Sequence, residues 1–264
     1  MTTTSPWTGM VPIDDTALAV TDTGGQGRPI LYLNGQFASQ RHWRRVVAEL
    51  GSGYRHLTYD MRARGGSGRS AEAASFEAHV RDVSTVLAAR EVERPLLVGW
   101  SYGGPVALHW AARNPGRVLG VVCVDGGYPY EFALTEEQVR RWWLRSRWLL
   151  PLLAKVGMAG RMSAEQHARS NIELNEIYAA LGPVLDGLTC PVRYVVATGG
   201  NIGGGHDEME SMRASLGPVL ARKPNIEVSA KVASNHGSIL RKDFRAVADA
   251  VRELAQRSAD RGSG

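Results

Sequence analysis

Short apolar runs alternate with longer amphipathic stretches along most of this chain, and the two patterns predict different elements. The short runs are typical of buried strands, which we expect at 17–23, 30–34, 54–59, 95–100, 118–124, 191–197 and 226–232. The longer stretches have helical spacing and predict helices at 40–50, 76–90, 102–113, 207–221 and 242–256. Strands that alternate with helices indicate an α/β fold, with a mostly parallel sheet covered by helices on both faces.

One long segment interrupts this alternation. Residues 129–188 contain no convincing strand pattern and predict two or three helices instead. An insertion of this kind, between two strands of the sheet, would form a helical cap. We therefore divide the chain into an α/β core at 9–128 and 189–256 and a cap at 129–188. The two ends, 1–8 and 257–264, are expected to be disordered tails.

Composition and charge are those of a globular protein. The chain has 264 residues, 44% hydrophobic and 22% charged, enough to bury a large core. Its net charge of +5 comes mostly from scattered arginines, so a nucleic-acid partner is not expected. Neither a signal-peptide pattern nor a membrane-spanning apolar run is found, and no membrane partner is expected. Cys123 and Cys190 are the two cysteines; we predict no disulfide between them and a cytoplasmic location.

The most informative short motif is a serine between two glycines, Gly99-Trp100-Ser101-Tyr102-Gly103. It follows an apolar run and precedes a predicted helix. Glycines at both ends would permit a sharp strand-to-helix turn, since larger side chains there would collide with neighbouring backbone. Such a turn would expose the Ser101 hydroxyl and place the Tyr102 amide at a helix N-terminus. We predict that Ser101 is a nucleophile.

A serine hydroxyl needs a base to remove its proton, and that base is usually a histidine. The chain has seven histidines. Those at 42, 56, 79, 109 and 167 lie within expected elements, where packing or surface roles are favoured, and His206 lies in a glycine-rich loop. His236 follows the last predicted strand and precedes the last helix, so its loop would lie over the Ser101 turn. We predict His236 as the base.

Three motifs, which occur in the expected order along the chain, resemble those of the α/β-hydrolase superfamily over residues 11–256. They are the turn at 99–103, the loop Asn235-His236-Gly237, and Asp60-Met61-Arg62-Ala63-Arg64-Gly65-Gly66-Ser67, which is similar to the family's Asp-x-Arg-Gly-x-Gly-x-Ser loop. The resemblance implies an eight-stranded, mostly parallel sheet with a helical cap inserted after the sixth strand. It also implies that Asp60 and Arg62 have structural roles, with Ala63 replacing one glycine.

The acid that orients the histidine follows the seventh strand in most of that superfamily, but Gly200 or Asn201 occupies that place here. Asp125 ends the sixth strand, where some relatives carry the acid, although it could also be a turn residue before two glycines. Asp207 lies nearer the usual place, yet its context also fits a helix N-cap. We predict Asp125 as the acid and keep Asp207 as the alternative.

The resemblance also implies where an oxyanion would be held. Leu33-Asn34-Gly35-Gln36-Phe37 occupies the place of the family's His-Gly loop. The amides of Gln36 and Tyr102 would then form the oxyanion hole. The Gln36 side chain would either add a further donor or lie at a polar rim.

Aromatic residues in and beside the predicted cap are the candidate substrate-binding residues. They are Tyr128, Tyr130, Trp142, Trp143 and Trp148. Such side chains could line a pocket for an apolar acyl or alcohol group. The alternative for the tryptophans is that they pack the cap onto the core.

These observations predict a serine hydrolase that cleaves a small apolar carboxylic ester or lactone through an acyl-enzyme on Ser101, with no cofactor and no metal. Haloalkane dehalogenases and epoxide hydrolases resemble the chain but carry aspartate in place of this serine. Two alternatives stay open. One is a different reaction in the same pocket, such as C–C bond hydrolysis, perhydrolysis or cofactor-free oxygen chemistry. The other is a non-catalytic ligand-binding module.

Overall fold

The computed structural model describes residues 4–199 and 206–260. Within these residues, eight strands form one sheet in the order β1-β2-β4-β3-β5-β6-β7-β8. β1 pairs antiparallel with β2, and β2 pairs antiparallel with β4, while all the pairs from β4 to β8 are parallel. This arrangement confirms the predicted fold class. The strands are β1 Trp7–Ile13, β2 Thr16–Asp22, β3 Arg28–Leu33, β4 Tyr54–Tyr59, β5 Leu96–Trp100, β6 Gly120–Val124, β7 Val192–Ala197 and β8 Ile226–Val232.

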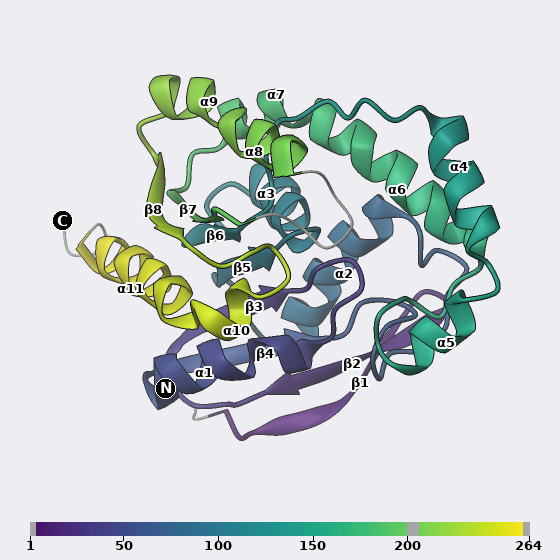
Figure 1. Ribbon diagram of the computed structural model, residues 1–264. Helices are drawn as coiled ribbons and strands as arrows, with labels where there is room; N and C mark the ends of the chain where they lie inside the picture. The colour runs from purple at the N-terminus through teal and green to yellow at the C-terminus, as the bar shows by residue number, and fades with distance from the viewer. Residues whose placement is uncertain (1–3, 200–205, 261–264) are drawn as a thin grey trace.

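Helices cover both faces of the sheet (Figure 1). On one face, α1 and α11 pack against alternate residues of β3, β5 and β6. On the other face, α2, α3, α7, α8 and α9 contribute to a larger apolar cluster. Burial of apolar side chains on both faces explains why the central strands are almost continuously hydrophobic. The bounds of these helices are α1 Arg44–Leu50, α2 Phe76–Ala89, α3 Gly103–Arg113, α7 Leu181–Gly187, α8 His206–Ala214, α9 Gly217–Arg222 and α11 Phe244–Asp260, and the short α10, Ile239–Lys242, precedes α11.

The segment between β6 and β7 holds four helices in place of the expected two or three. They are α4 Glu136–Arg145, α5 Leu150–Lys155, α6 Ala164–Ala179 and α7 Leu181–Gly187. Two of them begin at capping boxes, because Thr135 and Ser163 each accept a bond from the amide three residues on. Val139, Trp143, Leu150 and Ala168 form a small apolar cluster that joins α4, α5 and α6. In Figure 1 these teal and green helices lie to the side of the sheet away from α11.

The expectation of disordered tails is wrong for the described part of each. Trp7 and Thr8 belong to β1, whose first pair is Trp7 with Asp22, and α11 extends to Asp260. The sequence did not reveal β1 because Gly9 and Pro12 interrupt its alternation. An edge strand tolerates proline, whose missing N–H can lie on the unpaired side. Residues 1–3 and 261–264 lie outside the described part of the chain.

Other departures are small. The expected helix 207–221 is divided into α8 and α9, and α9 begins at Gly217-Pro218, as is common for proline in a first helical turn. The expected helix 40–50 begins as the 3-10 turn Gln40–Trp43. Among the described helices, none is long and apolar enough to cross a membrane.

Candidate active site

Ser101 lies in the short turn between β5 and α3. Its φ of 53° is in the left-handed region, which non-glycine residues rarely occupy and which costs about 1–3 kcal/mol. A Cβ on Gly99 would come within 2.2 Å of the Gly103 carbonyl oxygen, and one on Gly103 within 2.1 Å of the Leu33 oxygen. The two glycines are therefore required by the close approach of strand and helix. The amide of Ser101 donates to the Val124 carbonyl of β6 (3.0 Å), which fixes the turn against the next strand.

A continuous chain of hydrogen bonds leads from this serine to a carboxylate. Ser101 Oγ lies 2.8 Å from His236 Nε2, and His236 Nδ1 lies 2.8 Å from Asp125 Oδ2. The carboxylate can only accept, so Nδ1 carries the proton and Nε2 is left to accept from the serine hydroxyl. His236 follows β8 and is also held through its backbone, since Trp100 Nε1 donates to its carbonyl (3.2 Å). Three residues from the ends of three strands thus meet in hydrogen-bonded order.

Asp125 is fully buried at the end of β6 and is bound on both oxygens. Oδ1 accepts bonds from the Tyr128 hydroxyl (3.1 Å), the Ala197 amide (3.2 Å) and Arg213 Nε (3.0 Å). Oδ2 accepts from His236 and from Arg213 Nη2 (2.9 Å). Burial opposes ionisation, but the bonds from His236 and Arg213 outweigh it and hold the pKa of Asp125 below its usual range.

The structure separates the two candidate acids. Asp207 is exposed in the first turn of α8, after His206, so it is not the cap residue that its sequence context suggested. Within the described residues it makes no contact with His236. The positions Gly200 and Asn201, where most relatives carry the acid, lie outside the described residues. Asp125 is therefore the carboxylate that the structure brings to His236.

Arg213 is the residue at this site that sequence reasoning missed. It lies on α8 and is 88 positions from Asp125 along the chain, so no local pattern joins the two. One signal was present: a carboxylate after an apolar strand requires a partner, and Arg213 is the single cation of the predicted helix 207–221.

The Gln36 and Tyr102 amides lie in the two loops that flank Ser101. Neither amide has a protein acceptor among the described residues, whereas the Gln36 side chain donates to Ser170 Oγ of α6 (3.2 Å). The Tyr102 ring turns away from the site and packs edge-on against Phe76 and His79 in the core. Two backbone donors are thus available near the serine, and the Gln36 side chain links its loop to the inserted helices.

A buried arginine holds the Gln36 loop from behind. Arg64 donates from Nε to the Gln36 carbonyl (2.9 Å) and from Nη1 to the carbonyls of Arg62 (2.8 Å) and Ala73 (2.9 Å). Burial lowers the pKa of Arg64 to about 10, which still leaves it charged at neutral pH. Asn34, where the family has histidine, bridges the Tyr59 carbonyl and the Trp43 indole. The loop is therefore fixed at both ends.

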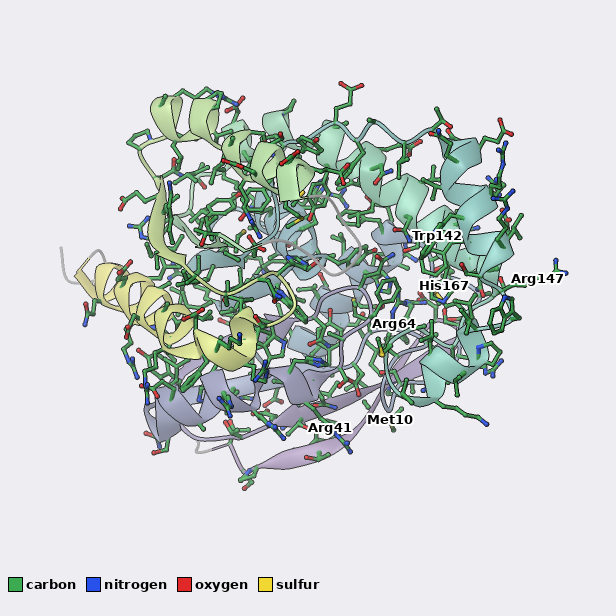
Figure 2. All side chains as sticks on the ribbon, viewed as in Figure 1. Met10, Arg41, Arg64, Trp142, Arg147 and His167 are labelled. Carbon is green, nitrogen blue, oxygen red and sulfur yellow. The ribbon has the colours of Figure 1, made fainter. Side chains whose placement is uncertain are left out.

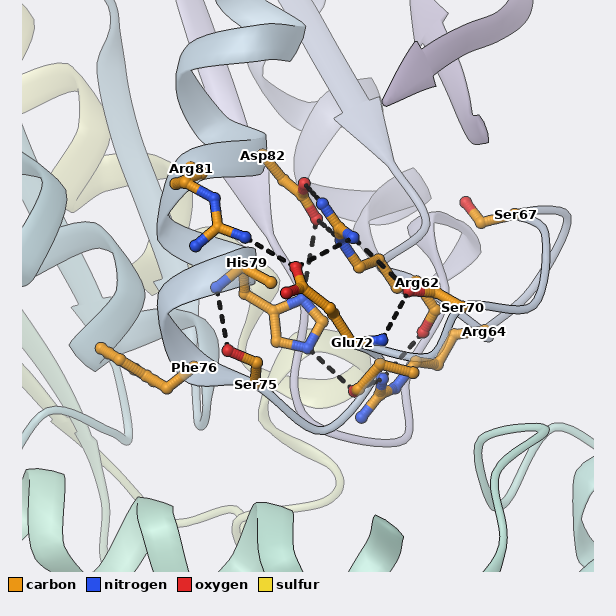
Figure 3. A network of polar contacts seen from close by, with 12 residues as sticks. Arg62, Arg64, Ser67, Ser70, Glu72, Ser75, Phe76, His79, Arg81 and Asp82 are labelled. Atoms are coloured by element: carbon orange, nitrogen blue, oxygen red, sulfur yellow. Dashed lines mark hydrogen bonds and ion pairs between the residues drawn. The ribbon is translucent and has the colours of Figure 1, made fainter. Parts of the chain in front are cut away.

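Arg62 binds carboxylates away from Ser101. Its guanidinium forms two bonds with Asp82 of α2 (2.9 and 2.7 Å) and a third with Asp14 Oδ2 (2.9 Å). Figure 3 shows Arg62 facing Asp82, with Glu72 between Arg62 and Arg81. The Asp60 carboxylate accepts hydrogen bonds from the backbone amides of Gln40 and Gly66. These contacts fit the structural role that the resemblance implied for Asp60 and Arg62.

The candidate substrate-binding residues occupy different environments. Tyr128 does not line an entrance, because it is fully buried against Tyr194 with its hydroxyl on Asp125. Tyr130 is partly buried and packs edge-on against Phe132. The expected substrate-binding role of Tyr128 is therefore not supported. Its hydroxyl instead donates a hydrogen bond to Asp125.

The three tryptophans also differ from one another. Trp143 is 7% exposed, and its ring stacks on that of His167 with a centroid distance of 4.6 Å. Its ring centroid lies 6.0 Å from that of Phe37, the residue after Gln36. Trp142 and Trp148 are 60% and 74% exposed. In Figure 2, the side chain of Arg147, just before Trp148 in the chain, extends away from the molecule. Only Trp143, of the three, packs toward the loop that flanks Ser101.

A cleft of about 1680 Å³ opens beside the site. It lies between the segment 150–166 and the loops at 37–44 and 63–69, and Phe37 is part of its wall. Neither Ser101 nor His236 lines it. Within the described residues, no group of three or more histidine, cysteine, aspartate or glutamate side chains is arranged to hold a metal ion.

Comparison with known proteins agrees with this fold. A family model described as "alpha/beta hydrolase fold" matches residues 28–182, and the chain belongs to this family. Among curated relatives, a haloalkane dehalogenase of Mesorhizobium japonicum is 31% identical over 128 residues, 48% of this chain and 41% of that protein. A 2-hydroxymuconate semialdehyde hydrolase of a Pseudomonas species is 35% identical over 116 residues, 42% of this chain and 41% of that protein. The matches thus span about two fifths of these relatives.

Solved structures resemble the chain over nearly its whole length. A thermophilic esterase from Thermogutta terrifontis aligns with a TM-score of 0.72 and 21% identity, over 96% of this chain and 99% of that one. The crystal structure of a putative lipase from Acinetobacter baumannii aligns with a TM-score of 0.75 and 15% identity, over 97% and 93%. At these identities the likeness shows the shared fold.

Proposed function

We propose that this chain is a serine hydrolase that cleaves a small apolar carboxylic ester or lactone through an acyl-enzyme on Ser101. The observation that carries the proposal is the hydrogen-bonded chain from Ser101 through His236 to Asp125, with both links at 2.8 Å. Nucleophile, base and orienting acid in this order make up the arrangement that activates a serine hydroxyl.

In the first half of the reaction, Ser101 Oγ attacks the carbonyl carbon of the substrate while His236 Nε2 takes the hydroxyl proton. The carbonyl oxygen becomes an oxyanion, which the amides of Gln36 and Tyr102 stabilise. Asp125 stabilises the imidazolium that forms. When the tetrahedral intermediate collapses, the bond to the alcohol oxygen breaks, and that oxygen receives the proton from His236.

In the second half, water attacks the acyl-enzyme. His236 removes a proton from the water, and the second tetrahedral intermediate is held by the same two amides. Its collapse releases the carboxylic acid and returns the proton to Ser101.

We propose that the segment 129–188 acts as a cap, with Trp143 and Phe37 bordering the acyl group and Tyr130 nearer the rim. Free thiols at Cys123 and Cys190 support a cytoplasmic location.

A second candidate is hydrolysis of a C–C bond. The relative that supports it is the 2-hydroxymuconate semialdehyde hydrolase, which is 35% identical over its match. Dehalogenation is disfavoured, since serine and not aspartate stands at the turn. A non-catalytic module is also disfavoured, because such a module would be expected to have an interrupted hydrogen-bond chain.

The test combines labelling with a substrate panel. We expect a fluorophosphonate to modify Ser101, as located by peptide mass spectrometry, and p-nitrophenyl acetate and butyrate to be hydrolysed. Ser101→Ala should abolish labelling and lower kcat by on the order of a million-fold. As a control, Ser146→Ala removes a hydroxyl that bonds only to a backbone carbonyl on α4, and it should leave both readouts unchanged.

Two outcomes would contradict the proposal. Full labelling and turnover in Ser101→Ala would exclude this serine as the nucleophile. Rapid loss of 2-hydroxymuconate semialdehyde absorbance, with p-nitrophenyl esters hydrolysed far more slowly, would favour C–C hydrolysis.

A further inference from the structure

All three guanidinium nitrogens of Arg213 donate hydrogen bonds at the site. Nε and Nη2 bind the two oxygens of Asp125 at 3.0 and 2.9 Å, and Nη1 donates to the Gly199 carbonyl just after β7 (2.8 Å). The side chain is 9% exposed. A paired, bidentate geometry of this kind fixes the plane of the carboxylate as well as its position. Asp125 is therefore held by Arg213 in the orientation in which Oδ2 meets His236.

The charged groups around Asp125 show how the contact with Arg213 stabilises the ionised carboxylate. In the described residues the titratable groups that face the carboxylate are His236, Arg213, Tyr128 and, one contact further, Tyr178 and Tyr194. Burial raises the pKa values of the three tyrosines, so they stay neutral. While His236 is neutral, Arg213 is thus the one cation in contact with a fully buried carboxylate. Without it, burial would favour the protonated acid, which cannot stabilise an imidazolium.

We propose that Arg213 is a positioning residue that keeps Asp125 ionised and aligned while His236 is neutral, and that it extends the reaction to lower pH. Asp125 resists protonation because the guanidinium remains beside it. This inference rests on the proposed function, since it concerns the same Ser101 reaction.

Two variants separate the charge of Arg213 from its hydrogen-bonding fork. Arg213→Gln keeps a donor but removes the charge, and Arg213→Lys keeps the charge but loses the fork. A matched control is Arg222→Gln on the neighbouring α9, where the arginine forms a similar two-bond pair with Asp186 (2.7 and 3.2 Å) in exposed positions. The readout is kcat/KM for p-nitrophenyl butyrate as a function of pH, recorded at the isosbestic wavelength of p-nitrophenol.

We expect the acidic limb of the profile to move up by about one pH unit or more in Arg213→Gln, as is typical for the loss of a contacting opposite charge. Arg213→Lys should keep the limb near its original pH. Misalignment of the carboxylate should lower kcat by about a hundredfold or less in both variants. Arg222→Gln should change neither quantity.

A fall in kcat with the acidic limb unmoved in Arg213→Gln would overturn the proposal, since it would show a purely structural role. If circular dichroism shows that Arg213→Gln does not fold, Arg213→Met, which also removes the charge, takes its place. An acidic limb that moves up in Arg213→Met supports the proposal, and one that stays in place contradicts it. Ser101→Ala, measured in parallel, distinguishes failure of the Arg213 proposal from failure of the proposed function. Full activity in Ser101→Ala would overturn the proposed function itself.

Discussion

Side chains have opposite environments at the carboxyl ends of β5, β6 and β8 and in the inserted helices α4–α6. At the strand ends, Asp125 is buried, and both of its oxygens accept several hydrogen bonds. The inserted helices expose large apolar side chains instead. Of the exposed large hydrophobic residues in the described chain, only Met10 lies outside this insertion; the others are Leu134, Trp142, Leu144, Trp148, Leu152, Val156 and Met158.

Under the proposed function, this difference separates the residues that carry out the reaction from those that select the substrate. Groups at the strand ends are positioned by backbone pairing and dense hydrogen bonding, so each substitution there should affect the reaction itself. The insertion is joined internally by a cluster of only a few buried side chains, among them Trp143 and Leu150. Changes there should affect local stability and the choice of substrate while leaving the reacting groups in place. Each of the following predictions tests this division.

The largest effect is expected at Asp125. Asp125→Asn should lower kcat by roughly ten-thousandfold, because an amide favours the wrong imidazole tautomer and cannot stabilise the imidazolium. The measurement is steady-state hydrolysis of one p-nitrophenyl ester, with folding checked by circular dichroism. Asp207→Ala should cost up to about 1 kcal/mol of stability through the α8 dipole and leave turnover nearly intact. The reverse pattern would assign the acid to Asp207.

A smaller effect, on stability, is expected at Trp143. Trp143→Ala should lower the free energy of unfolding by about 3–5 kcal/mol, because a buried ring that packs on His167 and Phe37 is lost. Urea denaturation measures this change. Trp148→Ala removes a ring of the same type from an exposed position and should change stability by only about 0.5 kcal/mol or less.

The same variants sharpen the comparison when esters of different chain length are tested. If Trp143 borders the acyl group, Trp143→Ala should lower kcat/KM for long-chain esters much more than for acetate. An equal loss for every ester, in step with lower stability, would show that Trp143 only packs the insertion.

The smallest predicted effect concerns acid stability, and it involves one histidine from the α/β core and one from the insertion. Burial lowers the pKa values of His109 in α3 and His167 in α6 from 6.5 to about 4. Between about pH 6.5 and about pH 4, these two histidines are therefore protonated in the unfolded chain and neutral in the folded chain. Each histidine should leave stability unaffected above about pH 6.5 and lower it by on the order of 3 kcal/mol as the pH falls to about 4.

Urea denaturation at several pH values checks this prediction. Both His109→Gln and His167→Gln should flatten the decline in stability between about pH 6.5 and about pH 4. If His167→Gln has no effect while His109→Gln flattens the curve, the insertion unfolds before the core and does not share its cooperative transition.

The fold and the central hydrogen-bond chain were accessible from the sequence for the same reason. Parallel strands that alternate with helices bring their carboxyl ends to one edge, so Ser101, Asp125 and His236 could be placed together by counting strands. β1 was not predicted, since an edge strand needs neither strict alternation nor freedom from proline. Tyr128 was placed in the wrong environment, because nothing in its sequence context says that its hydroxyl binds a carboxylate three residues earlier.

Side-chain contacts between distant elements explain what the sequence could not supply. Arg213 reaches Asp125 across 88 residues, and its helix shows only that a lone cation is present. Likewise, Trp142 and Trp143 are neighbours about 100° apart on a helix, and only Trp143 is buried. The sequence does not say which of the two packs inward. Packing with His167 and Phe37 decides that Trp143 is buried.

The position of the acid on β6 also affects how the protein can change during evolution. Ser101 and Asp125 follow adjacent strands, and the amides of these two residues bond to Val124 and Val195 on the next strands. Their separation is therefore set by the strand spacing of about 4.8 Å and not by any loop. Sequence changes in the inserted helices α4–α6 could therefore diversify the protein without altering the distance between nucleophile and acid.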